Sequence, residues 1–203
     1  MALYKDHPEY KSIIGSKGLD KRFRNNIFEK IDAFTKVPTK NDDIKVLGLI
    51  KNHRVWRYIE RKYVDLSSEN LFRYKILIPR SNGSGALGEV LSTPLIGEPL
   101  IGEPLIGYTQ TFIGFGAFQS EDEAKNAFKY IKTKFARTML GILKITQDNN
   151  RATWAEVPMQ DFTSNSDIDW NKSIPEIDQQ LYKKYNLSND EINFIETKVQ
   201  AMK

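Results

Sequence analysis

The chain has 203 residues, of which 40% are hydrophobic and 28% charged, and these fractions are typical of one ordinary globular domain. It contains no cysteine, which excludes disulfide scaffolds, zinc–thiolate sites, iron–sulfur clusters and thiol catalysis. Its two histidines, His7 and His53, argue against a multi-histidine metal site. The sequence shows no signal-peptide pattern and no apolar run long enough to cross a membrane, so we expect a cytoplasmic protein without a membrane partner.

The net charge of +4 hides an uneven distribution of charge along the chain. Residues 1–80 carry 18 basic and 10 acidic side chains, whereas residues 81–203 carry 12 and 16. The densest basic stretch is 51–62, in which Trp56 and Tyr58 are interleaved with five cations. Such a basic end favours the binding of a polyanion, and a solvated surface without a ligand is the alternative.

The first predicted element is a β-hairpin over residues 41–64. An apolar run is followed by a polar turn at 51–54, after which apolar and polar residues alternate. This period of two places Arg57 and Arg61 on the same face as Val55.

A short strand over residues 74–79 comes next and leads into a flexible polar loop over 80–85. Residues 94–108 then read PLIGE, PLIGE and PLIGY, three units with a period of five. Because each proline lacks a backbone donor and each glycine favours a turn, this segment excludes a helix and a central strand. We expect an ordered, non-helical surface arm or edge segment whose Leu-Ile pairs pack on the domain.

The second half of the sequence is mainly helical in pattern. Residues 109–118 predict a strand that ends in a glycine turn, and Ser120 with Glu123 matches a capping box. Apolar residues then recur with the helical period, so we expect one continuous helix over 120–145. A short strand or extended piece is expected at 154–162.

Two more helices follow, the first marked by apolar residues from Ile174 to Tyr185 and the second opened by a capping box of Ser188 and Glu191. The elements together predict an α/β (α+β) fold, a twisted mixed or antiparallel sheet with a long packed helix and a C-terminal helical hairpin. We expect one domain over 1–203, with a lead-in at 1–43, the sheet, arm and long helix at 44–162, and the acidic hairpin at 163–203.

Two patterns bear on catalysis. Phe112 to Gly116 fits the F-x-G-x-G turn that binds S-adenosylmethionine in DNA methyltransferases, and the alternative is a strand with small residues at a close packing point. The chain has no Pro-Pro dipeptide, so the catalytic loop of amino-methyltransferases is absent. Glu123 and Lys125 have the spacing of a nuclease motif but lie in the first turn of a helix, with no acid on a preceding strand. We therefore predict no catalytic, cofactor-binding or metal-binding residue in this chain.

The candidate DNA-binding residues come from the hairpin, the polar loop and the long helix. Basic side chains on a β-ribbon suit phosphates or a groove, and arginine with asparagine suits guanine and adenine. The full set is Arg54, Arg57, Arg61, Lys62, Arg80, Ser81, Asn82, Ser84, Lys132 and Arg137. A polar turn and solvated faces are the alternatives for these residues.

Three stretches carry a resemblance to a known family: 74–108 (YKILIPRSNGSGALGEVLSTPLIGEPLIGEPLIGY), 109–144 (TQTFIGFGAFQSEDEAKNAFKYIKTKFARTMLGILK) and 153–188. They resemble the C-terminal part of bacterial restriction–modification proteins, in which a target recognition domain follows an adenine-specific DNA methyltransferase domain, sometimes with a nuclease in the same polypeptide. The resemblance implies a non-catalytic module that recognises double-stranded DNA. S-adenosylmethionine, and Mg²⁺ where a nuclease is present, then belong to the partner catalytic domain. A protein–protein docking subunit and a small S-adenosylmethionine-dependent enzyme are the alternatives.

Overall fold

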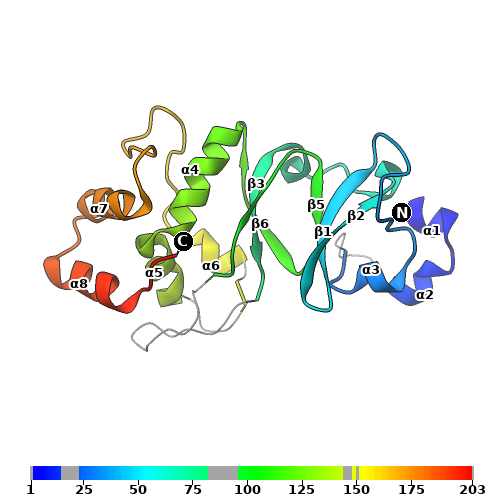
Figure 1. Cartoon of the computed structure of the whole chain (residues 1–203), viewed down its shortest axis with the longest axis horizontal. Coiled ribbons are helices and arrows are strands. Elements are labelled where there is room, and N and C mark those ends of the chain that lie inside the picture. Colours follow the sequence, from blue (N-terminus) through cyan, green and yellow to red (C-terminus); the bar gives the residue numbers. More distant parts are fainter. Residues whose placement is uncertain (1, 15–22, 82–95, 144–147, 150, 203) are drawn as a thin grey trace. The chain divides into compact units, whose positions relative to one another are not determined.

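The computed structural model describes residues 2–14, 23–81, 96–143, 148–149 and 151–202. Within these residues the chain forms two three-stranded sheets and eight α-helices (Figure 1), which confirms the expected α+β class. The sequence predicts one domain with one sheet, whereas the structure divides the chain into two compact units. The first unit is Met1–Tyr74 with Gly102–Phe112, and the second is Lys75–Ile101 with Ile113–Lys203.

The sheet of the first unit has the order β2-β1-β5, with β1 at Ile44–Ile50, β2 at His53–Ile59 and β5 at Ile106–Tyr108. β1 and β2 form the predicted antiparallel hairpin. Lys51 and Asn52 between them have φ angles of 47° and 63°, and positive φ at both positions is what a two-residue type I′ turn requires. The turn is therefore shorter than the four residues expected, and His53 and Arg54 belong to β2.

The register of the hairpin decides which side chains share a face. Ile44 lies opposite Ile59 and Val46 opposite Arg57, so these four residues lie on one face of the sheet. Ile44, Val46 and Ile59 belong to the core of this unit, which residues of its helices complete. These helices are α1 (Ala2–Asp6), α2 (Tyr10–Ile14) and α3 (Ile27–Lys30). Arg57 therefore lies on the core side of the ribbon.

The alternation predicted beyond Ile59 is wrong. β2 ends at that residue, and Arg61 lies in the short 3-10 helix η1 (Arg61–Tyr63). Arg57 and Arg61 therefore do not share a strand face.

The second sheet has the order β4-β3-β6, with β3 at Tyr74–Pro79, β4 at Leu100–Gly102 and β6 at Phe112–Phe118. The strand predicted at 74–79 is confirmed, and Ile76, Leu77 and Ile78 are fully buried in this central position. A second 3-10 helix, η2 (Glu69–Phe72), precedes β3.

The PLIG repeat supplies one edge strand to each sheet. The second unit of the repeat contains β4 and the third contains β5, so the expectation of a non-helical edge segment is confirmed. The described part of the repeat packs on the domain at Ile96 and Pro99, which are buried, whereas Glu103, Pro104 and Leu105 lie on the surface. Pro94 and Leu95 lie outside the described residues.

We expect the chain to tolerate deletion of one PLIGE unit. Removing 94–98 or 99–103 gives the same sequence, and both edge strands can still form from the units that remain. In the shortened chain Leu91 takes the position of Ile96, three residues before a proline of the repeat. A serine takes the position of Gly97, where a Cβ would lie 2.7 Å from Cγ of Pro79. We expect a cost of about 1–3 kcal/mol in unfolding free energy, measured by urea titration.

Deletion of residues 104–108 is the matched control for the shorter repeat. It places a glutamate where Tyr108 now donates a hydrogen bond to Asn70 Oδ1 at 3.3 Å, so it should destabilise the fold more than deletion of a PLIGE unit. Loss of cooperative unfolding on removal of one PLIGE unit would show that all three units are needed.

The prediction of one helix over 120–145 is wrong. The segment forms α4 (Glu121–Lys132) and α5 (Lys134–Leu143), and Thr133 between them is extended, with φ −60° and ψ 150°. The start of α4 is as predicted, because Ser120 Oγ accepts a hydrogen bond from the Glu123 N–H at 3.2 Å.

The break is stabilised by partners for its backbone groups. Thr133 Oγ1 accepts from the Ala136 N–H at 3.1 Å, as an N-cap does for a new helix. The carboxylate of Asp178 accepts from the N–H groups of Lys134 at 3.1 Å and Phe135 at 2.9 Å. Asp178 lies in α7, so a distant residue completes the N-terminus of α5.

The remaining helices are α6 (Arg151–Ala155), α7 (Ile174–Lys184) and α8 (Asn189–Lys198). α7 and α8 are as predicted, and the expected capping box at Ser188 is confirmed. Tyr182 donates a hydrogen bond to Glu196 Oε1 at 3.0 Å and so links α7 to α8 in the predicted hairpin. The extended piece expected from Trp154 is wrong at its start, because Trp154 lies in α6.

Candidate nucleic-acid interface

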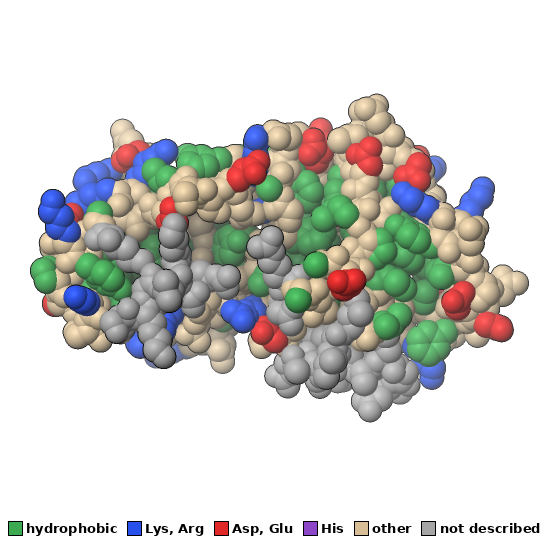
Figure 2. Space-filling model, turned by 180° about the vertical axis from the view of Figure 1, so that it is seen from behind, with side chains coloured by type: hydrophobic (Ala, Val, Ile, Leu, Met, Phe, Trp, Pro, Cys, Tyr) green, Lys and Arg blue, Asp and Glu red, His purple; other side chains and the backbone are tan. Residues whose placement is uncertain are grey.

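The turn and first strand residues of the β1–β2 hairpin form an exposed polar cluster, which we call the hairpin tip. It consists of Lys51, Asn52, His53 and Arg54, all of them exposed. These side chains offer two permanent cations, an amide and an imidazole, which are groups that bind phosphate oxygens and base edges. The tip belongs to a unit with 16 Lys and Arg against 11 Asp and Glu, a balance of +5, while the second unit has 14 against 15. Figure 2 shows Lys and Arg side chains gathered at the left of the view, on the first unit.

The sheet face opposite the core combines aromatic and basic side chains, and we call it the aromatic face. By the strand register it contains Lys45, Leu47, Leu49, Arg54, Trp56, Tyr58, Ile106 and Tyr108. Lys45 Nζ lies 4.6 Å from the centre of the Trp56 ring. Arg54 Cζ lies 5.8 Å from the centre of the Phe112 ring. Among the described strand residues that share this face, none is acidic.

Three predicted residues of the same unit hold other parts of the fold. Arg57 is half-buried, and its Nη1 donates to the Trp56 carbonyl at 2.9 Å. Lys62 Nζ lies 2.6 Å from Asp6 Oδ2, and this hydrogen bond to α1 raises the pKa of Lys62. Arg61 is half-buried in η1. Of the predicted hairpin residues, Arg54 is the one that lies in the exposed hairpin tip.

The polar loop after β3 is only partly described. Arg80 forms a two-pronged ion pair with Asp148, with Nε 3.0 Å from Oδ1 and Nη2 3.2 Å from Oδ2. Ser81 is exposed and forms a β-bridge with Asp148. Asn82 and Ser84 lie outside the described residues. Because Asp148 already occupies the fork of Arg80, a guanine or phosphate would have to displace this carboxylate, and base reading by Arg80 stays a prediction.

The two helix residues of the predicted set do not lie on a solvated face. Lys132 is 6% exposed and has Glu98 at 3.4 Å and the ring of Phe128 at 4.8 Å. Arg137 is 1% exposed, and its guanidinium donates to the carbonyls of Lys132, Thr133 and Gln200. Arg137 therefore satisfies carbonyls at the helix break, and we remove both residues from the candidate interface.

The glycine pattern at 112–116 lies inside β6 rather than in a turn before α4. Gly116 has φ +75°, and a Cβ on it would lie 2.2 Å from Cζ of Phe118. Close packing and backbone geometry thus explain this glycine without a cofactor. In the part of the chain that the structure describes, no three His, Asp or Glu side chains are placed to hold a metal ion. No helix among the same residues is long and apolar enough to span a membrane.

Lys45 was missing from the predicted interface. Side chains along β1 alternate between the two faces of the sheet, and the hairpin register places Lys45 on the same face as Trp56 and Tyr58. The sequence alone does not give this register. Phe112 follows Arg54 by 58 residues in the sequence and reaches it only through the fold, so no local pattern could have indicated this contact.

Comparison of the chain with protein-family models, curated proteins and solved structures gives no match. A function for this chain is therefore argued from its own residues.

Proposed function

We propose that this chain is the DNA target recognition module of an adenine-specific restriction–modification system, and that the hairpin tip contacts the duplex. The observation that carries the proposal is the exposed cluster of Lys51, Asn52, His53 and Arg54 on a tight two-residue turn. A two-stranded ribbon fits the major groove of DNA, where its tip side chains meet base edges and flanking phosphates. Methyl transfer, and cleavage where a nuclease is present, take place in a separate catalytic domain with S-adenosylmethionine and Mg²⁺.

The charge of the module sets the expected strength of binding. A net charge of +5 on the first unit supports contact with phosphates, and such contacts release counterions and weaken as salt rises. We expect this chain by itself to bind duplex DNA with an affinity on the order of micromolar, because phosphate contacts would supply most of the binding.

The proposal predicts that the double variant Lys51→Ala/Arg54→Ala binds a duplex at least about tenfold more weakly at about 50 mM salt. Two lost phosphate contacts should also flatten the slope of log affinity against log salt by about two. Fluorescence anisotropy with a labelled duplex measures both quantities.

Lys36→Ala and Lys125→Ala are the matched controls, since both lysines are exposed and lie outside the hairpin tip. Each control should stay close to the wild-type affinity. Equal affinity of the double variant and the wild type at low salt would contradict a DNA-contacting tip.

The alternative function is protein docking, and one observation favours it. Met159 and Ile142 of the second unit are 64% and 63% exposed, and Phe194 on α8 is 41% exposed. Apolar side chains exposed to this extent would mark a docking surface where they lie in one contiguous patch. Unchanged DNA binding in the tip variant would leave docking as the better explanation of the chain.

A further inference from the structure

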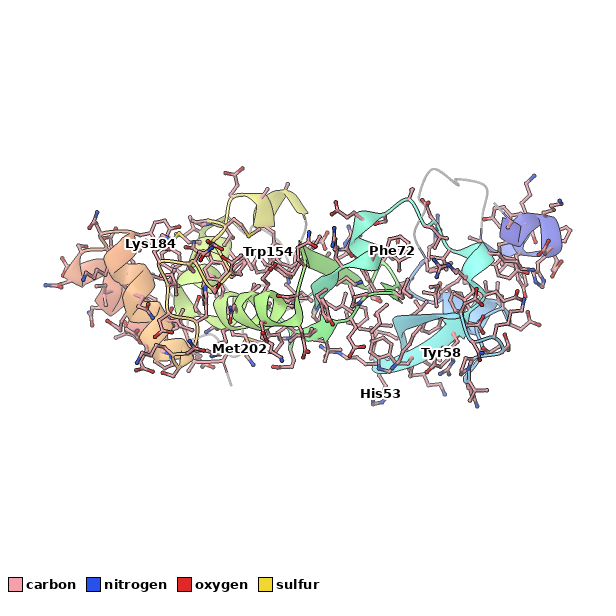
Figure 3. All side chains as sticks on the ribbon, turned by 90° about the horizontal axis from the view of Figure 1, so that it is seen from above. His53, Tyr58, Phe72, Trp154, Lys184 and Met202 are labelled. Atoms are coloured by element: carbon pink, nitrogen blue, oxygen red, sulfur yellow. The ribbon has the colours of Figure 1, made fainter. Side chains whose placement is uncertain are left out.

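The aromatic face holds two ring side chains that the core of its unit does not use. Trp56 and Tyr58 lie two residues apart on β2, so both side chains point to the sheet face opposite that of Ile59. Ile59 is 1% exposed and belongs to the core that the helices complete. Both rings are half-buried and keep part of their surface open. Figure 3 shows Tyr58 on β2, in the sheet of the first unit. Packing against the helices α1 to α3 therefore does not explain why this face carries aromatic residues.

Cations accompany these rings at short range. Lys45 lies directly opposite Tyr58 on β1, and its ammonium group is 4.6 Å from the centre of the Trp56 ring. Arg54 occupies the next position on the same face, two residues before Trp56. Adjacent positions on one strand face are about 7 Å apart, so the cations and rings alternate within a short distance. No described strand residue of this face supplies a negative charge.

This combination suits a ligand that carries both flat rings and negative charge. Bases stack on aromatic side chains through their π-faces, while phosphates between the bases bind lysine and arginine. In a duplex the bases are already stacked on each other, so their π-faces are not available to side chains on a sheet face. An acidic protein segment would match the charge but would leave the rings without stacking partners.

We propose that the aromatic face binds a single-stranded or locally unpaired stretch of DNA, with bases stacked on Tyr58 and Trp56 and phosphates held by Lys45 and Arg54. The inference rests on the proposed function for the assumption that the ligand is DNA. It names a surface that shares only Arg54 with the hairpin tip, and it names a different state of the strand. A target recognition module with this face would hold a segment whose pairing the partner enzyme has opened.

Tryptophan fluorescence tests the proposal on the full chain. Of the three tryptophans, Trp154 is 7% and Trp170 is 5% exposed, whereas Trp56 is half-buried on the aromatic face, so quenching reports chiefly on Trp56. An oligothymidine of about 12 nucleotides should quench the emission on binding. An abasic strand of equal length keeps the phosphates without the bases, and we expect it to bind at least fivefold more weakly and to quench less. Equal binding and quenching by the two strands would overturn the proposal.

Two substitutions at Tyr58 separate stacking from folding. Tyr58→Phe keeps the ring and should retain the affinity for oligothymidine within about twofold, whereas Tyr58→Leu should lose about tenfold. Phe194→Leu removes an exposed aromatic side chain from α8 and should leave the affinity unchanged. If Tyr58→Leu unfolds the chain, Lys45→Gln provides the second test, with a fall in affinity and a flatter salt slope expected. Equal affinity of Lys45→Gln and the wild type for oligothymidine would contradict the assigned phosphate contact.

The two proposals fail in different ways. If the hairpin tip contacts a duplex but the aromatic face is not a stacking surface, Lys51→Ala reduces duplex binding while Tyr58→Leu leaves single-strand binding intact. If the chain does not bind DNA, neither the duplex nor the oligothymidine binds at low salt.

Discussion

Replacing Arg137 by alanine is expected to lower the free energy of unfolding of the second unit by about 4 kcal/mol. Arg137 is 1% exposed, and its guanidinium donates to the carbonyls of Lys132 and Thr133 at 3.2 Å and of Gln200 at 2.6 Å. The substitution leaves these carbonyls without their donor, removes the cation that attracts the buried Asp178, and opens a cavity. Urea unfolding followed by circular dichroism measures the loss.

Lys125→Ala is the matched control for this experiment. Lys125 is another basic helix residue, but its side chain is 52% exposed and its ion pair with Glu121, at 2.9 Å, lies on the surface. Its removal should change the unfolding free energy by no more than about 0.5 kcal/mol. If Arg137 contacted phosphates instead, Arg137→Ala would weaken DNA binding and leave the unfolding curve in place, and that result would refute its structural role.

Local signals in the sequence predicted several elements correctly. The hairpin follows from the alternation around a polar turn, and the starts of α4 and α8 follow from Ser120 and Ser188 with a glutamate three residues later. Each of these signals lies within a few residues of the element that it specifies. Three prolines in the repeat likewise exclude a helix whatever the rest of the chain does.

The helix break at Thr133 has no comparable local signal. Apolar residues keep the helical period from Ala124 to Ile142, and threonine occurs inside helices at modest cost. The partner that completes the break is Asp178, 45 residues after Thr133, so periodicity alone predicts a continuous helix. The burial of Arg137 depends on the same break, which is why the sequence predicted a DNA contact for it instead.

The candidate site shows a similar division between local and distant information. A period of two correctly separates Arg57 from Trp56, but it does not say which face of the ribbon the core covers. The core packs on the face of Ile44, Val46 and Ile59, which is also the face of Arg57. The positions that suit a ligand are therefore those of Arg54 and Lys45 on the other face. The ion pair between Arg80 and Asp148 also joins residues far apart in sequence, so it could not be predicted from the loop.

The N-terminus of α5 is expected to make stability depend on pH through Asp178. Burial raises the pKa of Asp178 to about 6 from an ordinary value of 3.8, while hydrogen bonds from the Phe135 and Lys134 N–H groups act in the opposite direction. The nearby Glu196 also raises this pKa, and Arg137 lowers it. Because the folded chain binds this proton more tightly than the unfolded chain, the free energy of unfolding falls as the pH rises from about 4 to about 6. A shift of this size corresponds to about 3 kcal/mol.

Asp178→Asn isolates the contribution of this one group, since asparagine keeps an acceptor oxygen but has no proton to lose. Urea unfolding of both proteins at several pH values between about 4 and 7.5 gives the difference in stability, in which the other carboxylates largely cancel. We expect the advantage of the wild type to shrink by about 2–3 kcal/mol over this range. Asp122→Asn, at a side chain that is 90% exposed, controls for the loss of a surface charge. A difference that is constant or grows with pH would mean that the hydrogen bonds from α5, rather than burial, dominate at Asp178, and that the carboxylate stabilises the break in its charged form.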